Sequence, residues 1–334
     1  MEELNLARLP MYLSDEAEAW SLLERLRWPD GPVCPHCGNQ GGYFIKARSG
    51  QRTSKKGTVS YRRLWKCQNR ECAKQFSVLV GSIFESSKVP VSKWLLGLWL
   101  MSAGKNGVSA LELQRHLGVA YQTAWFMGHR LREAMTREPM ASLMSGTIVS
   151  DEAWIGGAPK NKHQQGRTRP YGPGGGGHIQ RGSRFETKTP VLALIDTETG
   201  EARTRVITNV KGSTLRQALS EELDLPNTTL YTDGNLGYRR LRSQLAGHEF
   251  VDHSRSEYVR GNVTTNPAES FFAQFKRSLD GTFHNVSPEH LHRYLAEFTF
   301  RWNTSKRTDH SRVEAIIRGA DGKRLTYRPI VEHG

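Results

Sequence analysis

Four cysteines in two pairs place the strongest constraint on how this chain folds. Cys34 and Cys37 have two residues between them, and Cys67 and Cys72 have four. Each pair fits a turn that presents two thiolates to one tetrahedral zinc ion, and no fifth cysteine is left over. We therefore predict a structural Zn²⁺ site in a zinc ribbon over residues 31–80, with a less regular turn at the wider second pair.

The chain shows no sign of export or membrane insertion. Its start lacks the basic and apolar segments that direct secretion. The longest apolar run, residues 94–101, is far shorter than the roughly 20 residues of a membrane-spanning helix. We expect a cytoplasmic protein with no membrane partner. Thiols stay reduced in that compartment, which favours zinc over the alternative of two disulfides.

Positive charge dominates, because 47 Lys and Arg against 33 Asp and Glu give a formal net charge of +14. This excess favours nucleic acid as a partner, since Lys and Arg neutralise phosphates. A basic protein with no such partner is the alternative. The segment between the cysteine pairs has no acidic residue and favours a phosphate-contacting hairpin, although a solvated loop has a similar composition. Its basic residues include Lys46, Arg48, Arg52, Lys55, Lys56, Arg62 and Arg63.

Helical patterns lie on both sides of the zinc ribbon. Residues 1–30 contain one short amphipathic helix near 14–28, for which Ser14 is a suitable cap. Residues 81–145 are predicted to be helical, and Ser92 can cap the helix that carries the apolar run.

A helix-turn-helix is predicted within this second region. Ser109 and Glu112 form a capping-box pattern, Gly118 suits the turn, and a second helix begins near Tyr121. The second helix would present polar side chains to DNA, unless the helical hairpin serves only in packing. The side chains it would present are Gln122, Thr123, His129 and Arg130, of which Gln122, Thr123 and Arg130 are the predicted DNA contacts.

Residues 146–303 have the pattern of an α/β domain with a mixed sheet. A strand is followed by a β-hairpin over 191–195 and 202–207, then a helix, a strand and two more helices. A basic, glycine-rich insert at 158–189 lacks the apolar residues for a core, and either DNA binds it or it is a tolerated surface insertion. Residues 304–334 are predicted to be a basic, irregular tail.

Three acidic residues in this domain are candidates for metal-dependent chemistry. Asp151 and Asp233 each follow an apolar run typical of a strand, and Glu269 lies where a helix begins. Phosphoryl transfer between DNA strands uses two divalent cations held by carboxylates, and Mg²⁺ prefers such oxygen ligands. The spacing between these residues is weak evidence, whereas their placement at strand ends and a helix start supports a shared site.

Each of these acids also has a structural interpretation. Glu269 is suited to a capping box in which Asn266 caps the helix, and Asp233 with Gly234 forms a common turn signal. Glu152 competes with Asp151 for one role, and we favour Asp151 because it follows the apolar run directly. The reserve candidates are Asp196 and Asp252.

The sequence as a whole resembles a known family, the bacterial insertion-sequence transposases with an N-terminal zinc ribbon and an RNase H-like DDE domain, insertion sequence 1595 group. The resemblance covers about residues 15–303. It is carried by residues 28–38, 74–77, 81–84, 151–152, 156–157, 232–234, 265–270, 276–277, 281–284 and 301–303. The four-residue gap of the second cysteine pair and the long insert depart from the simplest pattern of the family.

The resemblance implies that Asp151, Asp233 and Glu269 bind two catalytic Mg²⁺ ions in an RNase H-like fold. It also favours Lys276 and Arg277 as contacts to the DNA backbone, two helical turns beyond Glu269. The fold class expected is multidomain α/β, with the zinc ribbon and helix-turn-helix preceding the catalytic domain. A bacterial, nucleoid-associated location is expected.

The mechanism implied is DNA cleavage and strand transfer at the transposon ends. Water attacks a phosphodiester at the end of the element, and the freed 3′-hydroxyl then attacks target DNA. The partners would be double-stranded DNA, comprising terminal inverted repeats and target, and a homo-oligomer of this chain in the DNA complex. Two alternatives remain: a DNA-binding regulator whose acidic residues are inert, and an RNase H-like nuclease that cuts without joining.

Overall fold

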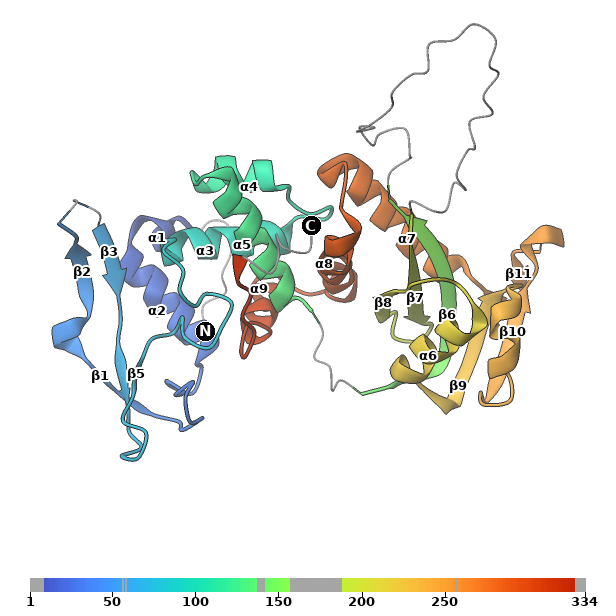
Figure 1. Ribbon diagram of the computed structural model, residues 1–334, viewed down its shortest axis with the longest axis horizontal. Helices are drawn as coiled ribbons and strands as arrows, with labels where there is room; N and C mark the ends of the chain where they lie inside the picture. The colour runs from blue at the N-terminus through green and yellow to red at the C-terminus, as the bar shows by residue number, and fades with distance from the viewer. Residues whose placement is uncertain are drawn as a thin grey trace, which may run out of the picture. The chain divides into compact units, whose positions relative to one another are not determined.

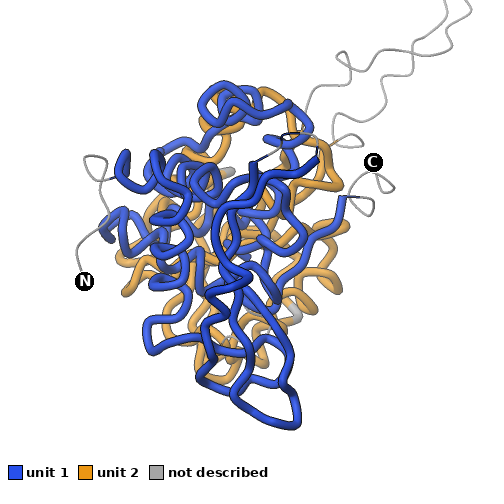
Figure 2. Tube along the Cα trace, turned by 90° about the vertical axis from the view of Figure 1, so that its left-hand side faces the viewer, with its two compact units in different colours: residues 1–141, 296–334 blue, residues 142–295 orange. Residues whose placement is uncertain are grey.

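The computed structural model describes residues 9–55, 57, 59–136, 142–156, 188–255 and 257–327. The chain divides into two compact units, which Figure 2 colours separately. Unit 1 consists of residues 1–141 with 296–334, and unit 2 consists of residues 142–295. The insert predicted at 158–189 lies outside the described residues, except for its last two.

Unit 1 begins with two helices and a group of short strands (Figure 1). β1, β4 and β5 form an antiparallel sheet, and β2 pairs with β3 in a separate hairpin. The structure therefore has the short, turn-rich strands of a ribbon around the cysteines. In chain order the elements are α1 (Leu9–Ser14), α2 (Glu16–Arg27), β1 (Gly42–Phe44), η1 (Lys46–Arg48), β2 (Gly50–Thr53), β3 (Val59–Arg62), β4 (Trp65–Cys67) and β5 (Gln75–Phe76).

The helix predicted near residues 14–28 is interrupted at its start. Asp15 separates α1 from α2, and its carboxylate accepts a hydrogen bond from the backbone N–H of Ala17 at 2.8 Å. Asp15 is thus the cap that the sequence pattern assigned to Ser14. Ser14 instead ends α1, where its hydroxyl donates to the carbonyl of Met11.

The start of α3 (Val91–Ala103) is capped by a residue from another helix. The Glu16 carboxylate accepts hydrogen bonds from the backbone N–H groups of Val91 and Ser92, at 2.6 and 3.1 Å. The prediction that Ser92 caps this helix is therefore wrong, because Ser92 lies inside it. A negative charge at this position also complements the positive end of the helix dipole.

The predicted pair of helices is present as α4 (Ala110–Leu117) and α5 (Tyr121–Ala134). Ser109 accepts a hydrogen bond from the backbone N–H of Glu112, as the capping-box pattern predicts. Gly118 ends α4 with a φ of 56°, a left-handed conformation that glycine adopts without steric cost. Local sequence signals therefore place this turn correctly.

One hydrophobic core runs through unit 1. It contains Trp20 of α2, Phe76 of β5, Trp94 of α3, Leu131 of α5 and Ile316 near the C-terminus, all nearly inaccessible to solvent. The N-terminal helix, the zinc ribbon and the helical region, predicted as separate domains, therefore share one core. Apolar faces that are too small to be stable separately are buried together.

The C-terminal residues correct the prediction of an irregular tail over 304–334. They include a helix, α9 (Asp309–Arg318), in which Val313, Ile316 and Ile317 are completely buried. These three residues have the i, i+3, i+4 spacing of an amphipathic helix, and flanking basic residues obscured that signal. A Cβ atom on Gly319 would lie 2.2 Å from the carbonyl oxygen of Ala134, so the end of α9 packs directly against the end of α5.

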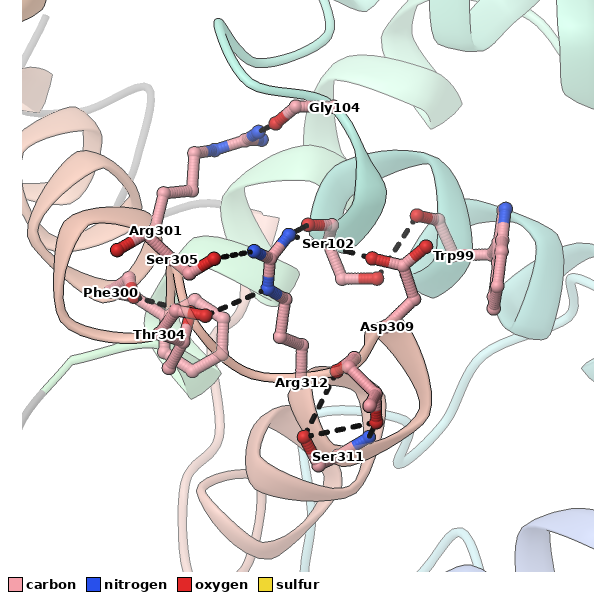
Figure 3. Close-up of polar contacts among 11 residues, drawn as sticks. Trp99, Ser102, Gly104, Phe300, Arg301, Thr304, Ser305, Asp309, Ser311 and Arg312 are labelled. Carbon is pink, nitrogen blue, oxygen red and sulfur yellow. Dashed lines mark hydrogen bonds and ion pairs between the residues drawn. The ribbon is translucent and has the colours of Figure 1, made fainter. Parts of the chain in front are cut away.

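Arg312 joins α9 to the end of α3 (Figure 3). Its guanidinium donates hydrogen bonds to the backbone carbonyls of Ser102, Thr304 and Ser305, at 3.2, 3.0 and 3.0 Å. Arg301 similarly donates to the carbonyl of Gly104. These contacts satisfy carbonyl groups at helix ends that have no partner inside the helix.

A buried ion group lies in the same part of unit 1. Glu297 accepts hydrogen bonds from Arg132, at 2.6 Å, and from Arg301, and each of the three side chains is less than a tenth exposed. Burial favours the protonated form of Glu297, but the two guanidiniums lower its pKa. Loss of one partner would leave a buried charge uncompensated, which typically costs about 3–5 kcal/mol.

Unit 2 is built on one five-stranded mixed sheet (Figure 1). The spatial order is β10-β9-β6-β7-β8, and only β7 runs against the others. This is the RNase H-like arrangement that the sequence predicts, including the hairpin of β7 and β8. The strands are β6 (Met144–Ile155), β7 (Thr189–Asp196), β8 (Ala202–Val206), β9 (Leu223–Asp233) and β10 (Gly247–Val251).

Helices cover the sheet of unit 2. α6 and η3 pack on one face through a cluster that includes Ile148, Leu215 and Tyr238, and α7 lies against β6 and β7. The helix predicted near 238–246 is instead η3 followed by β10. The remaining elements are α6 (Gly212–Glu222), η3 (Leu236–Leu241), η4 (His253–Arg255), β11 (Val259–Arg260), β12 (Val263–Thr264), α7 (Asn266–Ser278), η5 (Leu279–Phe283), η6 (Pro288–His290) and α8 (Leu291–Asn303), which continues into unit 1.

Candidate functional site

The four cysteines of unit 1 converge at one point. The Sγ atoms of Cys34 and Cys72 are 3.8 Å apart, those of Cys37 and Cys67 are 3.6 Å apart, and all four lie within 4.8 Å of one another. A tetrahedral ion with Zn–S bonds of about 2.3 Å requires sulfur–sulfur distances of about 3.8 Å. The thiols therefore have the number and spacing of a structural zinc site.

Backbone geometry at the two turns explains this convergence. Gly38 has a φ of 72° and donates its N–H to the carbonyl of Cys34, which closes the first turn. The wider second turn is closed on the carbonyl of Asn69, which accepts from the N–H groups of Cys72 and Ala73. Ala73 adopts a φ of 43°, an uncommon conformation for a residue with a side chain.

Backbone N–H groups also favour the anionic form of one sulfur. Burial opposes ionisation of Cys34, but hydrogen bonds from the amides of His36 and Cys37 lower its pKa. The thiolate is the form that binds metal, so these amides support the same interpretation.

In unit 2, the register of β6 with β9 brings Asp151 and Asp233 together. The parallel strands pair through Val149 and Tyr231, and the two acids lie two residues further along each strand. Because side chains alternate between faces, Asp151 and Asp233 lie on the same face, opposite that of Ile148 and Leu230. The prediction that Asp151 lies at a strand end is wrong, because β6 continues to Ile155. What ends before Asp151 is the pairing of β6 with β9.

Glu269 lies in the first turn of α7, and its carboxylate does not cap the helix backbone. Thr265 is the residue that precedes the helix, which places Ala268 rather than Glu269 at the third helical position. Glu269 Oε1 accepts a hydrogen bond from the Thr265 hydroxyl at 2.9 Å, and no side chain caps α7 at Thr265. The capping-box interpretation of Glu269 is therefore not what the structure shows.

The charges of Asp233 and Glu269 affect the ionisation of Asp151. Burial, together with the nearby charges of Asp233 and Glu269, raises the pKa of Asp151 to about 6. The backbone N–H of Glu152 and the imidazole of His253 act in the opposite direction. Among the described residues, only the cysteines gather three or more ligand atoms within 4.8 Å, so the acids form a looser cluster. Carboxylates that repel one another in this way attract cations.

Glu152 is a functional candidate that the sequence reasoning set aside. It points to the opposite face from Asp151, where it accepts hydrogen bonds from the Tyr238 hydroxyl and from Asn235, the latter at 3.4 Å. Asn235 in turn donates its backbone N–H to Asp233 at 3.0 Å. Burial and the charges of Asp233 and Asp151 raise the pKa of Glu152 to about 7. The two adjacent acids therefore have different roles instead of competing for one.

His253 is a second residue near the acids that the sequence pattern did not single out. Its Nε2 atom lies 3.7 Å from Glu269 Oε1 and 3.2 Å from the Thr265 hydroxyl oxygen. It also lowers the pKa of Asp151, as noted above. An isolated histidine carries no sequence signal, because only the fold brings η4 next to the start of α7.

The reserve acids lie in other settings. Asp196 accepts hydrogen bonds from the backbone N–H groups of Glu198 and Thr199 in the turn between β7 and β8. Asp252 pairs with Arg255 at 3.4 Å. Asp196 is thus a turn residue, and Asp151, Asp233 and Glu269 remain the candidate set.

Comparison with known proteins finds two family models that match this chain. The model of an ISXO2-like transposase domain matches residues 143–303, and that of a transposase zinc-ribbon domain matches residues 14–75. The chain belongs to the IS1595 group of transposases. A relative from Halobacterium salinarum, an uncharacterized protein in transposable element ISH50, is 28% identical over 306 residues, which is 91% of this chain and 97% of that protein.

Solved transposase complexes show only a distant likeness to this transposase. A pre-cleavage Mos1 transpososome is 15% identical, with 69% of this chain and 79% of that chain covered, at a TM-score of 0.28. A Mos1 strand transfer complex is 16% identical, with 64% and 77% covered, at a TM-score of 0.23. At these scores the likeness adds nothing to what the sheet topology shows.

Four of the five residues predicted to contact DNA are accessible in this transposase. Gln122 is exposed and Thr123 partly exposed in the first turn of α5, and Lys276 and Arg277 are exposed in the last turn of α7. In the part of the chain that the structure describes, no helix is long and apolar enough to cross a membrane.

The prediction that Arg130 contacts DNA is wrong. Its side chain is 4% exposed, donates a hydrogen bond to the carbonyl of Glu85 and lies over the rings of Trp94 and Phe126. Arg130 lies on the buried side of α5, next to Leu131 and three residues after Met127. A charged residue within the helix pattern suggested exposure, but Trp94 and the carbonyl of Glu85, which lie outside α5, cover this face of the helix.

Proposed function

We propose that this transposase binds the ends of its insertion sequence and catalyses metal-dependent cleavage and strand transfer of DNA. The observation that carries the proposal is the register of β6 and β9, which aligns Asp151 with Asp233 on the face that α7 covers. Glu269 enters the same site from the first turn of α7. Three carboxylates come from three separate elements, and Asp233 and Glu269 add to burial in raising the pKa of Asp151, which supports a site for cations.

The residues present fit a pair of Mg²⁺ ions. Burial and the charges of both Asp233 and Glu269 raise the pKa of Asp151, so we assign Asp151 to hold both ions, and Asp233 and Glu269 would each hold one. When bound, two such ions polarise the scissile phosphate and stabilise charge on the attacking and leaving oxygens. The zinc site of unit 1 would be structural, because four thiols leave no open position.

The reaction follows from two in-line displacements at phosphorus. In the first, water attacks the phosphodiester at the element end, the bond from phosphorus to the 3′-oxygen breaks, and that oxygen takes up a proton. In the second, the freed 3′-hydroxyl loses its proton and attacks a target phosphodiester, whose own 3′-oxygen leaves. The carboxylates are oriented by Thr265 on Glu269 and by Asn235 on Asp233. No covalent bond to the protein is needed.

Gln122 and Thr123 on α5 are proposed to contact DNA in a groove, and Lys276 and Arg277 on α7 to contact its backbone. Exposed positions in the first turn of a helix are suited to groove contacts, and basic side chains near the acids place phosphate close to the chemistry. DNA transposition pairs the two ends of an element before they are joined to target DNA, so we propose a homo-oligomer in the DNA complex.

The test uses the purified full chain with a plasmid that carries both ends of the element, in Mg²⁺. Asp151→Asn and Glu269→Gln should each slow cleavage by more than about 100-fold. End binding should stay within about twofold, because neither residue is proposed to bind DNA in the absence of the ions. Glu198→Gln, in an exposed turn of the same unit, is the matched control and should cleave normally. Cleavage by Asp151→Asn at the normal rate would refute the assignment.

A second assay separates this function from its two alternatives. Pre-cut element ends are incubated with target plasmid, and joined product is measured. A nuclease of this fold would cut the intact ends but yield no joined product, and a DNA-binding regulator would do neither. Joining that depends on Asp151 supports the transposase.

A further inference from the structure

Three of the basic residues that the sequence assigns to a phosphate-contacting hairpin lie near one another in the zinc ribbon. Arg48 ends η1, Arg52 lies in β2 and Arg62 lies in β3. Gly50 pairs directly with Arg62, and Arg52 lies two residues beyond Gly50 on the same strand. Because side chains alternate along a strand, Arg52 and Arg62 lie on the same face of the hairpin.

Hydrogen bonds bring the guanidinium groups of Arg52 and Arg62 to one acceptor, the backbone carbonyl of Arg48. Arg62 Nε donates to the carbonyl oxygen of Arg48 at 3.0 Å, and Arg52 Nη2 donates to the same oxygen at 3.4 Å. The Arg48 side chain itself is directed to Gln75, whose Oε1 accepts from Nη1 at 3.2 Å. Most of the N–H donors of the three guanidiniums remain available, since each group carries five.

The charges of this cluster are not compensated by the protein. In the described part of the chain, no carboxylate forms an ion pair with these three arginines, and residues 38–66 contain no acid. Burial and the positive charges of Arg52 and Arg48 lower the pKa of Arg62. Three like charges held together by the fold, with no anion among them, favour an external anion.

The adjacent residue, Arg63, shows what a structural arginine looks like in the same place. It pairs with Glu24 at 3.0 Å, and its guanidinium lies over the Phe44 ring, 5.0 Å from the centroid. Arg63 is thus neutralised by the body of unit 1. An arginine at this end of the hairpin can therefore pair with an acid of unit 1, as Arg63 does. Arg62 has no such carboxylate partner among the described residues.

Gly50 leaves space at the centre of the cluster. A Cβ atom at this position would have no neighbour within 4 Å, and the residue has a φ of 109°. The position opposite Arg62 is therefore open to a ligand rather than covered by a side chain.

We propose that Arg48, Arg52 and Arg62 form a binding site for a backbone phosphate of DNA, independent of base sequence. Guanidinium groups match the geometry of phosphate oxygens and bind them with paired hydrogen bonds. DNA is the favoured source of the phosphate because the chain is a transposase with a net charge of +14. The site rests on the proposed function only in that DNA is its partner; it takes no part in the chemistry.

The experiment measures the dissociation constant of the full-length, zinc-loaded protein for a short random-sequence DNA duplex over a range of salt concentrations. The double variant Arg52→Gln/Arg62→Gln should bind more weakly. The slope of its log–log salt dependence should fall by about 1, since the one lost phosphate contact contributes about 0.9 to that slope. The loss of affinity should be equal for a duplex from the element end, because backbone contacts carry no base information.

A control variant removes the same charge elsewhere in unit 1. Arg70→Gln/Lys105→Gln changes two exposed basic residues outside the cluster and should leave the salt dependence within about 0.5 of the wild-type slope. Arg52→Lys/Arg62→Lys keeps the charge and should keep most of the slope, which separates charge from a folding defect. Zinc content and thermal unfolding are measured for every variant.

Two results would overturn the proposal. One is an unchanged slope in a folded Arg52→Gln/Arg62→Gln variant, and the other is an equal fall in the Arg70→Gln/Lys105→Gln control. Failure of the proposed function appears differently, as a wild-type protein that binds duplex DNA with normal salt dependence but neither cuts nor joins element ends.

Discussion

The thiol cluster of unit 1 and the carboxylate cluster of unit 2 are assembled in opposite ways. The cysteines come from two local turns, and their sulfurs already have the spacing of one tetrahedral ion. The acids come from β6, β9 and α7, lie further apart, and raise the pKa of Asp151 through burial and repulsion. The thiol cluster is expected to stabilise the surrounding fold of unit 1, whereas the fold of unit 2 holds the carboxylates in position.

This difference separates a structural site from a reactive one. A closed set of four ligands completes a fold, whereas a reactive site must keep charge uncompensated and positions open for substrate. Removing a cysteine is therefore expected to lower the stability of unit 1, whereas removing an acid is expected to raise the stability of unit 2.

The largest effect is expected from loss of the zinc site. Cys67→Ser removes a ligand whose sulfur lies in the core of unit 1, and structural zinc contributes on the order of 10 kcal/mol to the folding of small domains. Bound zinc should fall from one ion to none, and hydrogen exchange should accelerate across residues 32–76 while unit 2 stays protected. His36→Ala, an exposed residue inside the first pair, should retain zinc. A variant Cys67→Ser that binds zinc normally would contradict the four-thiol site.

The second effect is a pH dependence of opposite sign in the two units. Asp151 and Glu152 have pKa values near 6 and 7, above their ordinary values, so folding favours their protonated forms. Their contribution to the stability of unit 2 is therefore fully present below about pH 4. That contribution is lost as pH rises through 6 and 7. In EDTA, the free energy of unfolding of unit 2 should therefore fall by about 2–4 kcal/mol between pH 5 and 8. The measurement is hydrogen exchange, corrected for the pH dependence of the intrinsic exchange rate.

Unit 1 should behave differently, because Arg132 and Arg301 lower the pKa of Glu297. Its contribution is present above the ordinary pKa of a glutamate and is lost as pH falls. Adding Mg²⁺ should reverse the loss in unit 2, since cations bind the ionised acids. If the stability of the two units depended on pH in the same way, the two clusters would not differ as described.

A third effect concerns Asp151 alone. Asp151→Asn should stabilise unit 2 by about 1–3 kcal/mol in EDTA near pH 7.5, because it removes a buried, repelled charge. The same variant should lose the stabilisation by Mg²⁺. Asp196→Ala, which removes a turn acceptor, should instead destabilise the unit by about 1 kcal/mol. A destabilised Asp151→Asn would show that the carboxylate is structural.

The smallest effect is expected at the residues that support the acids. Glu152→Gln and Tyr238→Phe interrupt the hydrogen bonds that lead through Asn235 to Asp233, so strand transfer should slow by about 10-fold. The Mg²⁺ concentration for half-maximal activity should rise, whereas end binding should not change. A loss of end binding would indicate a general folding defect instead.

Much of the fold was predictable from local patterns. The cysteine pairs, the turn at Gly118 and the hairpin of β7 and β8 depend on neighbouring residues, and the structure agrees with each. The interpretation of Arg130 as exposed, of residues beyond 303 as irregular and of Glu269 as a helix cap was wrong. For Arg130 and the residues beyond 303 the deciding contact comes from a segment far away in the chain, whereas for Glu269 it comes from Thr265, four residues earlier.

The sequence by itself determined which chemistry is available: four thiols at zinc spacing, a strong excess of basic residues, and acids beside predicted strands and helices. Tertiary structure decided which of these groups lie near one another. Strand register aligned Asp151 with Asp233, and the start of α7 brought Glu269 to the same face, because pairing and packing fix distances that sequence separation leaves open. The same packing turned Glu152 toward Tyr238 and buried Arg130, so neighbours in sequence received different roles.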